Sequence, residues 1–149
     1  ESGWPSLQLQ CSVEASCWVR GNLNTIALAL ENILRNAIRH SPEGGIVHLG
    51  GRRDGDFWHL WLEDQGGGVA EADLERIFLP FTRLDGSRPG DGGFGLGLSI
   101  ARNAVRRQGG RLWAQNTETG LRMNMRLVAD DGTISDDAFA GRLSHPATL

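Results

Sequence analysis

The hydrophobic period of this sequence switches repeatedly between that of a strand and that of a helix, and the order of the switches restricts the fold. Strand-like segments lie at residues 7–12, 17–20, 46–53, 56–64, 111–115 and 121–128. Helical spacing is found at residues 24–40, 71–77 and 96–108. A doubly wound α/β fold needs regular strand–helix alternation, which this order lacks. The sequence therefore predicts an α+β fold: a two-layer α/β sandwich with a mixed, mainly antiparallel sheet and helices packed on one face.

Polar and glycine-rich stretches mark the ends of these segments. Asn22 or Asn24 can cap the start of the long helix, and residues 41–45 (SPEGG) end it. The Asp-Gly pair at 54–55, between two apolar runs, predicts a tight hairpin. The Gly-Gly pair at 109–110 predicts the end of the last helix.

All 15 basic residues are arginine, and this usage excludes several kinds of site. Without lysine the chain has no P-loop, no strand lysine of the protein-kinase type and no Schiff-base lysine. The net charge of −3 argues against general nucleic-acid binding. Residues 1–129 balance 14 Arg against 14 Asp and Glu, whereas residues 130–149 hold four Asp and one Arg. We expect one domain over 1–129 and an acidic, loose tail over 130–149.

Three further features of the sequence bear on the cellular compartment and on the protein to which the chain belongs. The spacing of Cys11 and Cys17 is not that of a zinc site and predicts two small core or strand residues in a reducing compartment. The longest uninterrupted apolar run, residues 26–30, is too short to span a membrane. The first residues (ESGW) include no initiator methionine and no signal-peptide pattern, so we expect a piece of a longer protein.

Two asparagines in the long helix are the first candidate site. Asn32 and Asn36 are four residues apart and share a helix face, which Arg39 and His40 continue. Asparagine is a poor residue for a helix interior, and its carboxamide oxygen suits Mg²⁺. Arg39 could pair with phosphate oxygens. A solvated polar face with incidental asparagines explains the same residues equally well.

Two glycine-rich loops are the second candidate. In residues 61–69 (WLEDQGGGV), Asp64 ends an apolar strand and can accept a hydrogen bond from an exocyclic amine such as that of adenine. An ordinary Asp-Gly loop is the alternative. In residues 92–100 (GGFGLGLSI), alternating glycines open a helix whose free N–H groups can bind phosphate. The arginines that follow indicate a solvated helix face or a partner-binding surface: Arg102, Arg106, Arg107 and Arg111.

Taken together, these motifs resemble the catalytic, ATP-binding domain of sensor histidine kinases over residues 7–129. Residues 31–41 (ENILRNAIRHS) are similar to the family's N box, and residues 64–69 (DQGGGV) to its first glycine box. Residues 77–83 (IFLPFTR) are similar to the F box, and residues 92–98 (GGFGLGL) to the second glycine box. Four boxes in the family's order are a specific signal. The resemblance implies a Bergerat-type ATP site on an α/β sandwich.

The resemblance also implies a role for each site residue. Asn36 would be the Mg²⁺ ligand, with Asn32 beside it near the phosphates. Arg39 would contact phosphate, at a position where lysine is commoner, so that Asn32, Asn36 and Arg39 form the catalytic set. Asp64 would accept the adenine amine. The remaining residues implied to contact ATP are His40, Gly66, Gly68, Phe81, Arg83, Gly93, Phe94, Gly95, Leu96, Gly97 and Leu98, while Phe78, Phe81 and Arg83 would seat a lid over residues 84–92.

Asn32 distinguishes the branches of this superfamily. In the gyrase-type, chaperone, mismatch-repair and serine-kinase relatives, a glutamate four residues before the metal-binding asparagine acts as the base. Asn32 stands at that position and cannot take a proton, which argues against efficient hydrolysis or serine phosphorylation. The resemblance instead favours transfer of the ATP γ-phosphoryl group to a histidine on a separate dimerisation and phosphoacceptor domain. That domain is absent from this sequence.

The resemblance therefore predicts a protein-histidine kinase domain that uses ATP and Mg²⁺ in a two-component system. Its partners would be the phosphoacceptor domain of the same protein and, indirectly, a response regulator, with no nucleic acid and no membrane contact. We expect a monomeric cytoplasmic domain of a membrane-anchored sensor. Two alternatives stay open: a nucleotide-gated regulatory binding module without catalysis, and a free-standing Bergerat-fold ATPase.

Overall fold

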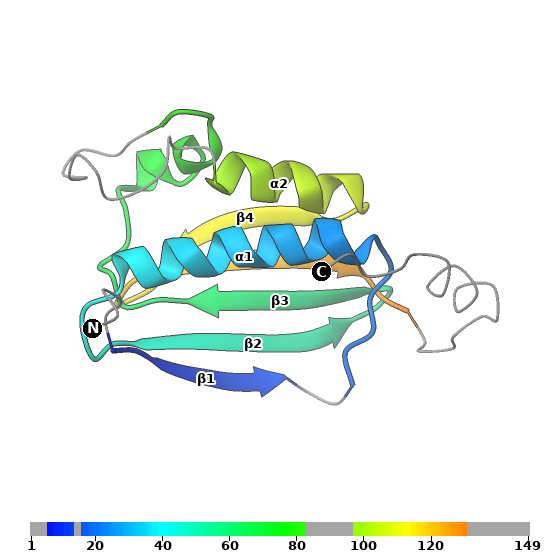
Figure 1. The fold of residues 1–149 in the computed structure, drawn as a ribbon, viewed down its shortest axis with the longest axis horizontal. Coiled ribbons are helices and arrows are strands. Elements are labelled where there is room, and N and C mark those ends of the chain that lie inside the picture. The colour runs from blue at the N-terminus through cyan, green and yellow to red at the C-terminus, as the bar shows by residue number, and fades with distance from the viewer. Residues whose placement is uncertain (1–5, 14–15, 83–96, 131–149) are drawn as a thin grey trace, which may run out of the picture.

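The computed structural model describes residues 6–13, 16–82 and 97–130 and shows one sheet with helices against it (Figure 1). The five strands stand in the order β1-β2-β3-β5-β4. β1 pairs with β2 in parallel, and the other three pairings are antiparallel. The elements are β1 (Gln8–Val13), α1 (Leu23–His40), β2 (Ile46–Asp54), β3 (Phe57–Glu63), the 3₁₀ turns η1 (Glu71–Asp73) and η2 (Arg76–Phe78), α2 (Gly97–Arg107), β4 (Arg111–Asn116) and β5 (Leu121–Val128).

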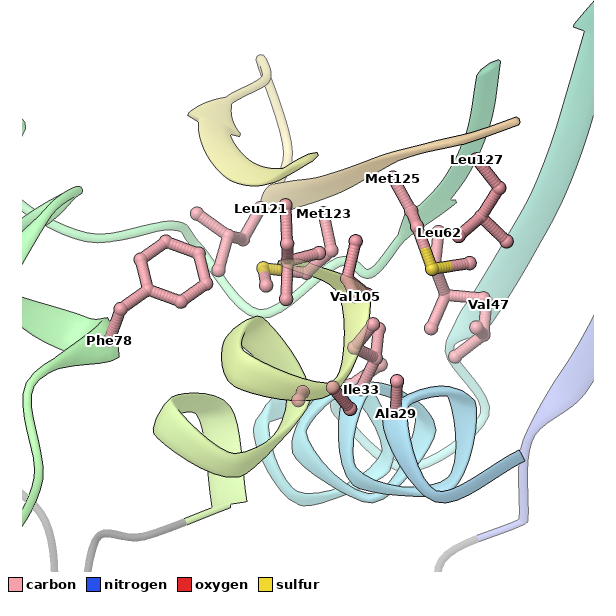
Figure 2. Packing of buried hydrophobic residues seen from close by; sticks show 14 residues of the cluster. Ala29, Ile33, Val47, Leu62, Phe78, Val105, Leu121, Met123, Met125 and Leu127 are labelled. Carbon is pink, nitrogen blue, oxygen red and sulfur yellow. The ribbon is translucent and has the colours of Figure 1, made fainter. Parts of the chain in front are cut away.

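The hydrophobic core lies between the sheet and the two helices. Alternate residues of β5 point into it, because successive side chains of a strand face opposite sides. Figure 2 shows Ala29 and Ile33 of α1 close to Val105 of α2 and Met125 of the sheet. Burying one such aliphatic side chain contributes about 1.5–3 kcal/mol. The predicted α+β fold, with a mixed, mainly antiparallel sheet and helices on one face, is confirmed.

Local signals in the sequence set most of the boundaries. Asn22, and not Asn24, caps α1: its side chain accepts from the Thr25 backbone N–H at 3.0 Å. The predicted hairpin is present, but its two turn residues are Gly55, with φ of +60°, and Asp56, one position later than the predicted Asp-Gly pair, because Asp54 still pairs with Phe57. No helix in the described ranges is long and apolar enough to cross a membrane.

Two predicted elements differ from the structure. Residues 17–20 form no full strand. Only Val19 makes a bridge, to Ala129, so this segment pairs with the chain at the end of β5 and does not add a strand to the sheet. Residues 71–77 form two 3₁₀ turns instead of one short helix. A segment this short gains too few hydrogen bonds to offset α-helix nucleation, and η2 is held by the burial of Phe78.

Candidate functional site

The asparagine face of α1 lies against the start of α2. The Asn32 side chain donates through Nδ2 to the Leu28 carbonyl oxygen at 2.9 Å, which leaves its Oδ1 for other partners. A Cβ atom added to Gly97 would lie 3.3 Å from that Oδ1. A Cβ atom there would be a tight contact that requires the Asn32 side chain to shift by a few tenths of an ångström, so the first residue of α2 lies directly beside Asn32. The structure thus brings the predicted N box and the end of the second glycine box together.

Asn36, Arg39 and His40 complete this face toward the end of α1. Asn36 is half-buried, and Arg39 and His40 are exposed. Ser41 ends the helix by donating its hydroxyl to the Ala37 carbonyl oxygen at 2.7 Å. No hydrogen bond to the Asn36 side chain comes from the residues that the structure describes. Its carboxamide oxygen is therefore available, and this neutral oxygen donor has the chemistry of an Mg²⁺ ligand.

Asp64 is the only buried acid of the described residues, with 4% of its surface exposed, and it directly follows β3. Its Oδ1 accepts from the Gly66 backbone N–H at 2.9 Å and from the Leu121 backbone N–H at 3.2 Å. A carboxylate costs much to bury unless it is hydrogen-bonded, and these two donors hold it in place. Both donors reach the same oxygen, and no donor to Oδ2 is found in the described part of the chain, so this second oxygen has the capacity to accept a further hydrogen bond.

Glycines let three backbone segments close around Asp64. A Cβ atom on Gly66 would overlap the backbone carbonyl oxygen of His40, and one on Gly120 would overlap the backbone of Asp64 itself. Gly68 has φ of +73°, and a Cβ atom there would lie 2.5 Å from Oδ1 of Asn116. The end of α1, the loop after β3 and the turn before β5 are therefore in direct contact. Gly66 and Gly68 were both expected in the site from the sequence.

Asn116 is a structural part of this site that the sequence did not reveal. It ends β4, and its side chain both accepts from the Val69 N–H at 2.9 Å and donates to the Val69 carbonyl oxygen at 2.7 Å. These two bonds fix the glycine loop from a residue 47 positions away. Nothing in the local sequence marks the residue, because its partner is brought to it by the pairing of β4 with β5 and β3 with β5.

The F-box segment is anchored to α2. Phe78 is buried, and the Arg102 guanidinium carbon lies 4.6 Å from the centre of its ring. Arg102 also binds Glu75 through two nitrogens, at 2.9 and 3.3 Å. The hydrogen bond from Arg102 holds the pKa of the Glu75 carboxyl below its usual value, with Coulombic help from Arg102, Arg106 and Arg111. Arg102 thus has a partner within the chain, which corrects the interpretation of this residue as solvated or partner-binding.

Of the remaining residues predicted to contact ATP, two lie within the described ranges and the rest lie outside them. Phe81 is 72% exposed and has φ of +62°, which is uncommon for a residue with a side chain. Leu98 is half-buried and packs against the hydrophobic core. The others lie outside the described residues: Arg83, Gly93, Phe94, Gly95, Leu96 and the lid expected at 84–92.

Comparison with known proteins identifies the family to which this arrangement belongs. Residues 21–131 match the family described as histidine kinase-, DNA gyrase B- and HSP90-like ATPases. Sensor protein PfeS of Pseudomonas aeruginosa is 59% identical over 129 residues, which are 87% of this chain and 28% of PfeS. Sensor histidine kinase WalK of Bacillus subtilis is 36% identical over 68% of this chain and 17% of WalK. The chain spans less than a third of the length of these relatives.

Solved structures agree on the architecture. The mycobacterial sensor histidine kinase MprB matches with a TM-score of 0.72 at 27% identity, over 83% of this chain and 82% of that one. The catalytic domain of histidine kinase ThkA has a TM-score of 0.72 at 24% identity, over 82% of this chain and 78% of that one, and shows the same fold. The resemblance to sensor histidine kinases is thereby confirmed, and the chain belongs to the family of histidine kinase-, DNA gyrase B- and HSP90-like ATPases, as a domain of the sensor histidine kinase type.

Proposed function

We propose that this chain binds ATP with Mg²⁺ between α1, the loop after β3 and the start of α2, and donates the γ-phosphoryl group to a histidine on a separate domain. The observation that carries the proposal is Asp64: a buried carboxylate held by two backbone N–H groups, with one oxygen left to accept. The glycines packed around it leave backbone rather than side chains beside this acceptor. A flat base with an exocyclic amine, such as adenine, fits that combination.

The phosphate end of the site would lie along α1. Asn32 presents its carboxamide oxygen beside the N-terminus of α2, where unpaired N–H groups and the helix dipole favour anions, and Asn36 lies one turn further along the same helix. Mg²⁺ usually shares its shell between protein oxygens, waters and phosphates, and we assign Asn36 as its protein ligand. Arg39, exposed one turn further on, would pair with phosphate oxygens.

The absence of a base at position 32 fits a histidine acceptor. A neutral imidazole has a nitrogen lone pair, so no group must remove a proton before that nitrogen attacks phosphorus. The bond from the γ-phosphorus to the bridging oxygen breaks as the phosphorus–nitrogen bond forms, and ADP leaves with the electron pair. The work left to this domain is positioning and neutralising charge, which Asn32, Asn36 and Arg39 can supply. Water or serine would need the missing base.

The names of the relatives support a place in a sensor protein. Since the chain spans less than a third of PfeS, the phosphoacceptor and sensing parts would be other domains of the same protein, and a response regulator would receive the phosphoryl group from the histidine. We propose that the domain works on the cytoplasmic side, where ATP is available.

Nucleotide-dependent thermal unfolding tests the binding site. A ligand at 100 times its dissociation constant adds about 2.7 kcal/mol, so ADP or ATP should raise the melting temperature, and Mg²⁺ should increase the effect. Asp64→Asn should abolish the rise. Asp54→Asn is the matched control, because it makes the same chemical change at an exposed residue that ends β2, at the opposite end of β3 from Asp64. No rise at millimolar nucleotide in the unaltered chain would reject the site.

Phosphoryl transfer tests the activity itself. A histidine-bearing dimerisation fragment from the same protein, mixed with this chain and labelled ATP, should become labelled. Free phosphate should appear far more slowly than the labelled histidine. Tight nucleotide binding without transfer would favour the nucleotide-gated binding module, and rapid phosphate release by the isolated chain would favour a free-standing ATPase.

A further inference from the structure

The face of the sheet opposite the helices carries a row of basic residues that the nucleotide site does not use. Strand register places Arg52 of β2 beside His59 of β3, His59 beside Arg126 of β5, and Arg126 beside Arg111 of β4. These four residues, here called the basic row, cross four adjacent strands. Leu60 and Leu62 of β3 and Met125 and Leu127 of β5 point into the core, so the alternate residues of the basic row point away from it.

Aromatic side chains support the basic row from within this face. The Arg126 guanidinium carbon lies 3.9 Å from the centre of the Phe57 ring, and that of Arg111 lies 4.9 Å from the Trp113 ring. His59 stacks on Trp113 with ring centres 5.5 Å apart. Guanidinium groups over aromatic rings keep their charge while losing part of their hydration. The face therefore presents cations in ordered positions.

Within the described part of the chain no ion pair neutralises the basic row, although Glu75 lies near enough to Arg111 for Arg111 to help lower the pKa of its carboxyl. The ion pairs found among residues 6–13, 16–82 and 97–130 include none for Arg52, Arg111 or Arg126, and Nε of Arg126 is buried without a hydrogen-bond partner. Arg122, four residues before Arg126 in β5, is by contrast paired with Glu63. Like charges directly opposite on neighbouring strands are destabilising. An anionic partner would therefore relieve the repulsion between Arg111 and Arg126, which lie opposite each other.

We propose that the acidic segment 131–137 (DGTISDD) of the same chain binds across the basic row. Its structure lies outside the described residues, but its sequence holds Asp131, Asp136 and Asp137 and no basic residue. It continues from Asp130, which is four residues beyond Arg126, or about 13 Å along an extended strand. Seven extended residues reach up to ~23 Å, so Asp136 and Asp137 can come within pairing distance of Arg126 and Arg111.

Tethering favours this occupant over a separate anion. A covalent connection of a few residues gives an effective concentration of the order of millimolar, which a free ligand must exceed. A surface of arginine and aromatic side chains can also bind an oligonucleotide, but the net charge of −3 of the chain opposes the approach of this anion. The contact is independent of the nucleotide site, because Asp64 and the basic row belong to different faces and ends of the sheet.

The test uses the full chain and its nitrogen–proton NMR spectrum. In Asp136→Asn/Asp137→Asn, we expect the side-chain N–H signals of Arg111 and Arg126 and the indole N–H signal of Trp113 to shift. This difference in signal position between the variant and the unaltered chain should vanish at about 1 M salt, where the screening length is about 3 Å. Glu118→Gln is the control: this exposed acid lies in the turn at the far end of β4 from Arg111 and should leave these signals in place.

Two further comparisons decide between occupants. In an Arg111→Gln/Arg126→Gln background, the two Asp→Asn changes should no longer move the Trp113 signal. A short oligo-deoxythymidine should bind the Asp→Asn variant more tightly than the unaltered chain, because the segment no longer competes. Identical spectra of the unaltered chain and the Asp→Asn variant, or equal oligonucleotide binding by both, would overturn the proposal.

Discussion

At the scale of single residues, the site depends on groups that are small or that bond to the backbone. Gly66 and Gly120 have no side chain, and this absence lets the end of α1, the loop after β3 and the turn before β5 meet around Asp64. Asn116 then ties the loop by bonding to both backbone groups of Val69. The nucleotide site is thus built as much by backbone contacts as by the residues that would touch ATP.

Replacing Asn116 should loosen this loop. Asn116→Ala leaves the N–H and carbonyl groups of Val69 without their partners, and an unsatisfied half-buried polar group costs about 1–3 kcal/mol. We expect a lower free energy of unfolding in urea and weaker nucleotide binding. Asn103→Ala is the control, because Asn103 is exposed on α2 and alanine is the better helix former. Equal losses in both variants would contradict the role given to Asn116.

At the scale of elements, the long helix and the hairpin were predictable because their signals are local. The apolar stripe of α1 and the hairpin turn both act over a few residues; the structure has the helix where it is expected and the turn one residue later than predicted. The prediction of a short helix over residues 71–77 was wrong because the conformation there is set by a distant contact, that of Glu75 and the following Phe78 with Arg102. The sequence also left Asn22 and Asn24 as equal candidates for the cap of α1.

The cap of α1 gives a matched pair of variants. Asn22→Ala removes the acceptor for the Thr25 backbone N–H and should lower the free energy of unfolding by about 1 kcal/mol. Asn24→Ala lies inside the first turn of α1, where alanine is favourable, and should be neutral or slightly stabilising. Urea unfolding of both variants checks the difference. If Asn24→Ala were the more damaging change, the cap would be misassigned.

At the scale of the whole molecule, the bond between Glu75 and Arg102 joins the F-box segment to α2. Its effect depends on pH, because the pKa of Glu75 lies below its usual value of 4.5 in the folded chain. An acid with a lowered folded pKa stabilises the fold above its unfolded pKa and loses that contribution as the pH falls through the folded value. Glu75 is 73% exposed, so the contribution is small.

Glu75→Gln should therefore lower the stability near neutral pH and flatten its loss in acid. Urea unfolding between about pH 7 and about pH 3 should show the variant and the unaltered chain converging below pH ~4.5. Glu118→Gln serves as the control, since Glu118 makes no ion pair among the described residues and should follow the unaltered chain throughout. A constant difference between Glu75→Gln and the unaltered chain at every pH would exclude the charge of Glu75 as the cause.

The sequence by itself determined most of the secondary elements, the α+β class and the family, because periodicity, caps, turns and the four boxes are carried by neighbouring residues. Only the tertiary structure decided how distant segments meet. The anchoring of the glycine loop by Asn116, the pairing of Arg102 with Glu75 and the alignment of the basic row follow from strand order and register. Such contacts join residues tens of positions apart, and no local pattern encodes their partners, since the partner is chosen by the packing of the whole sheet against its helices.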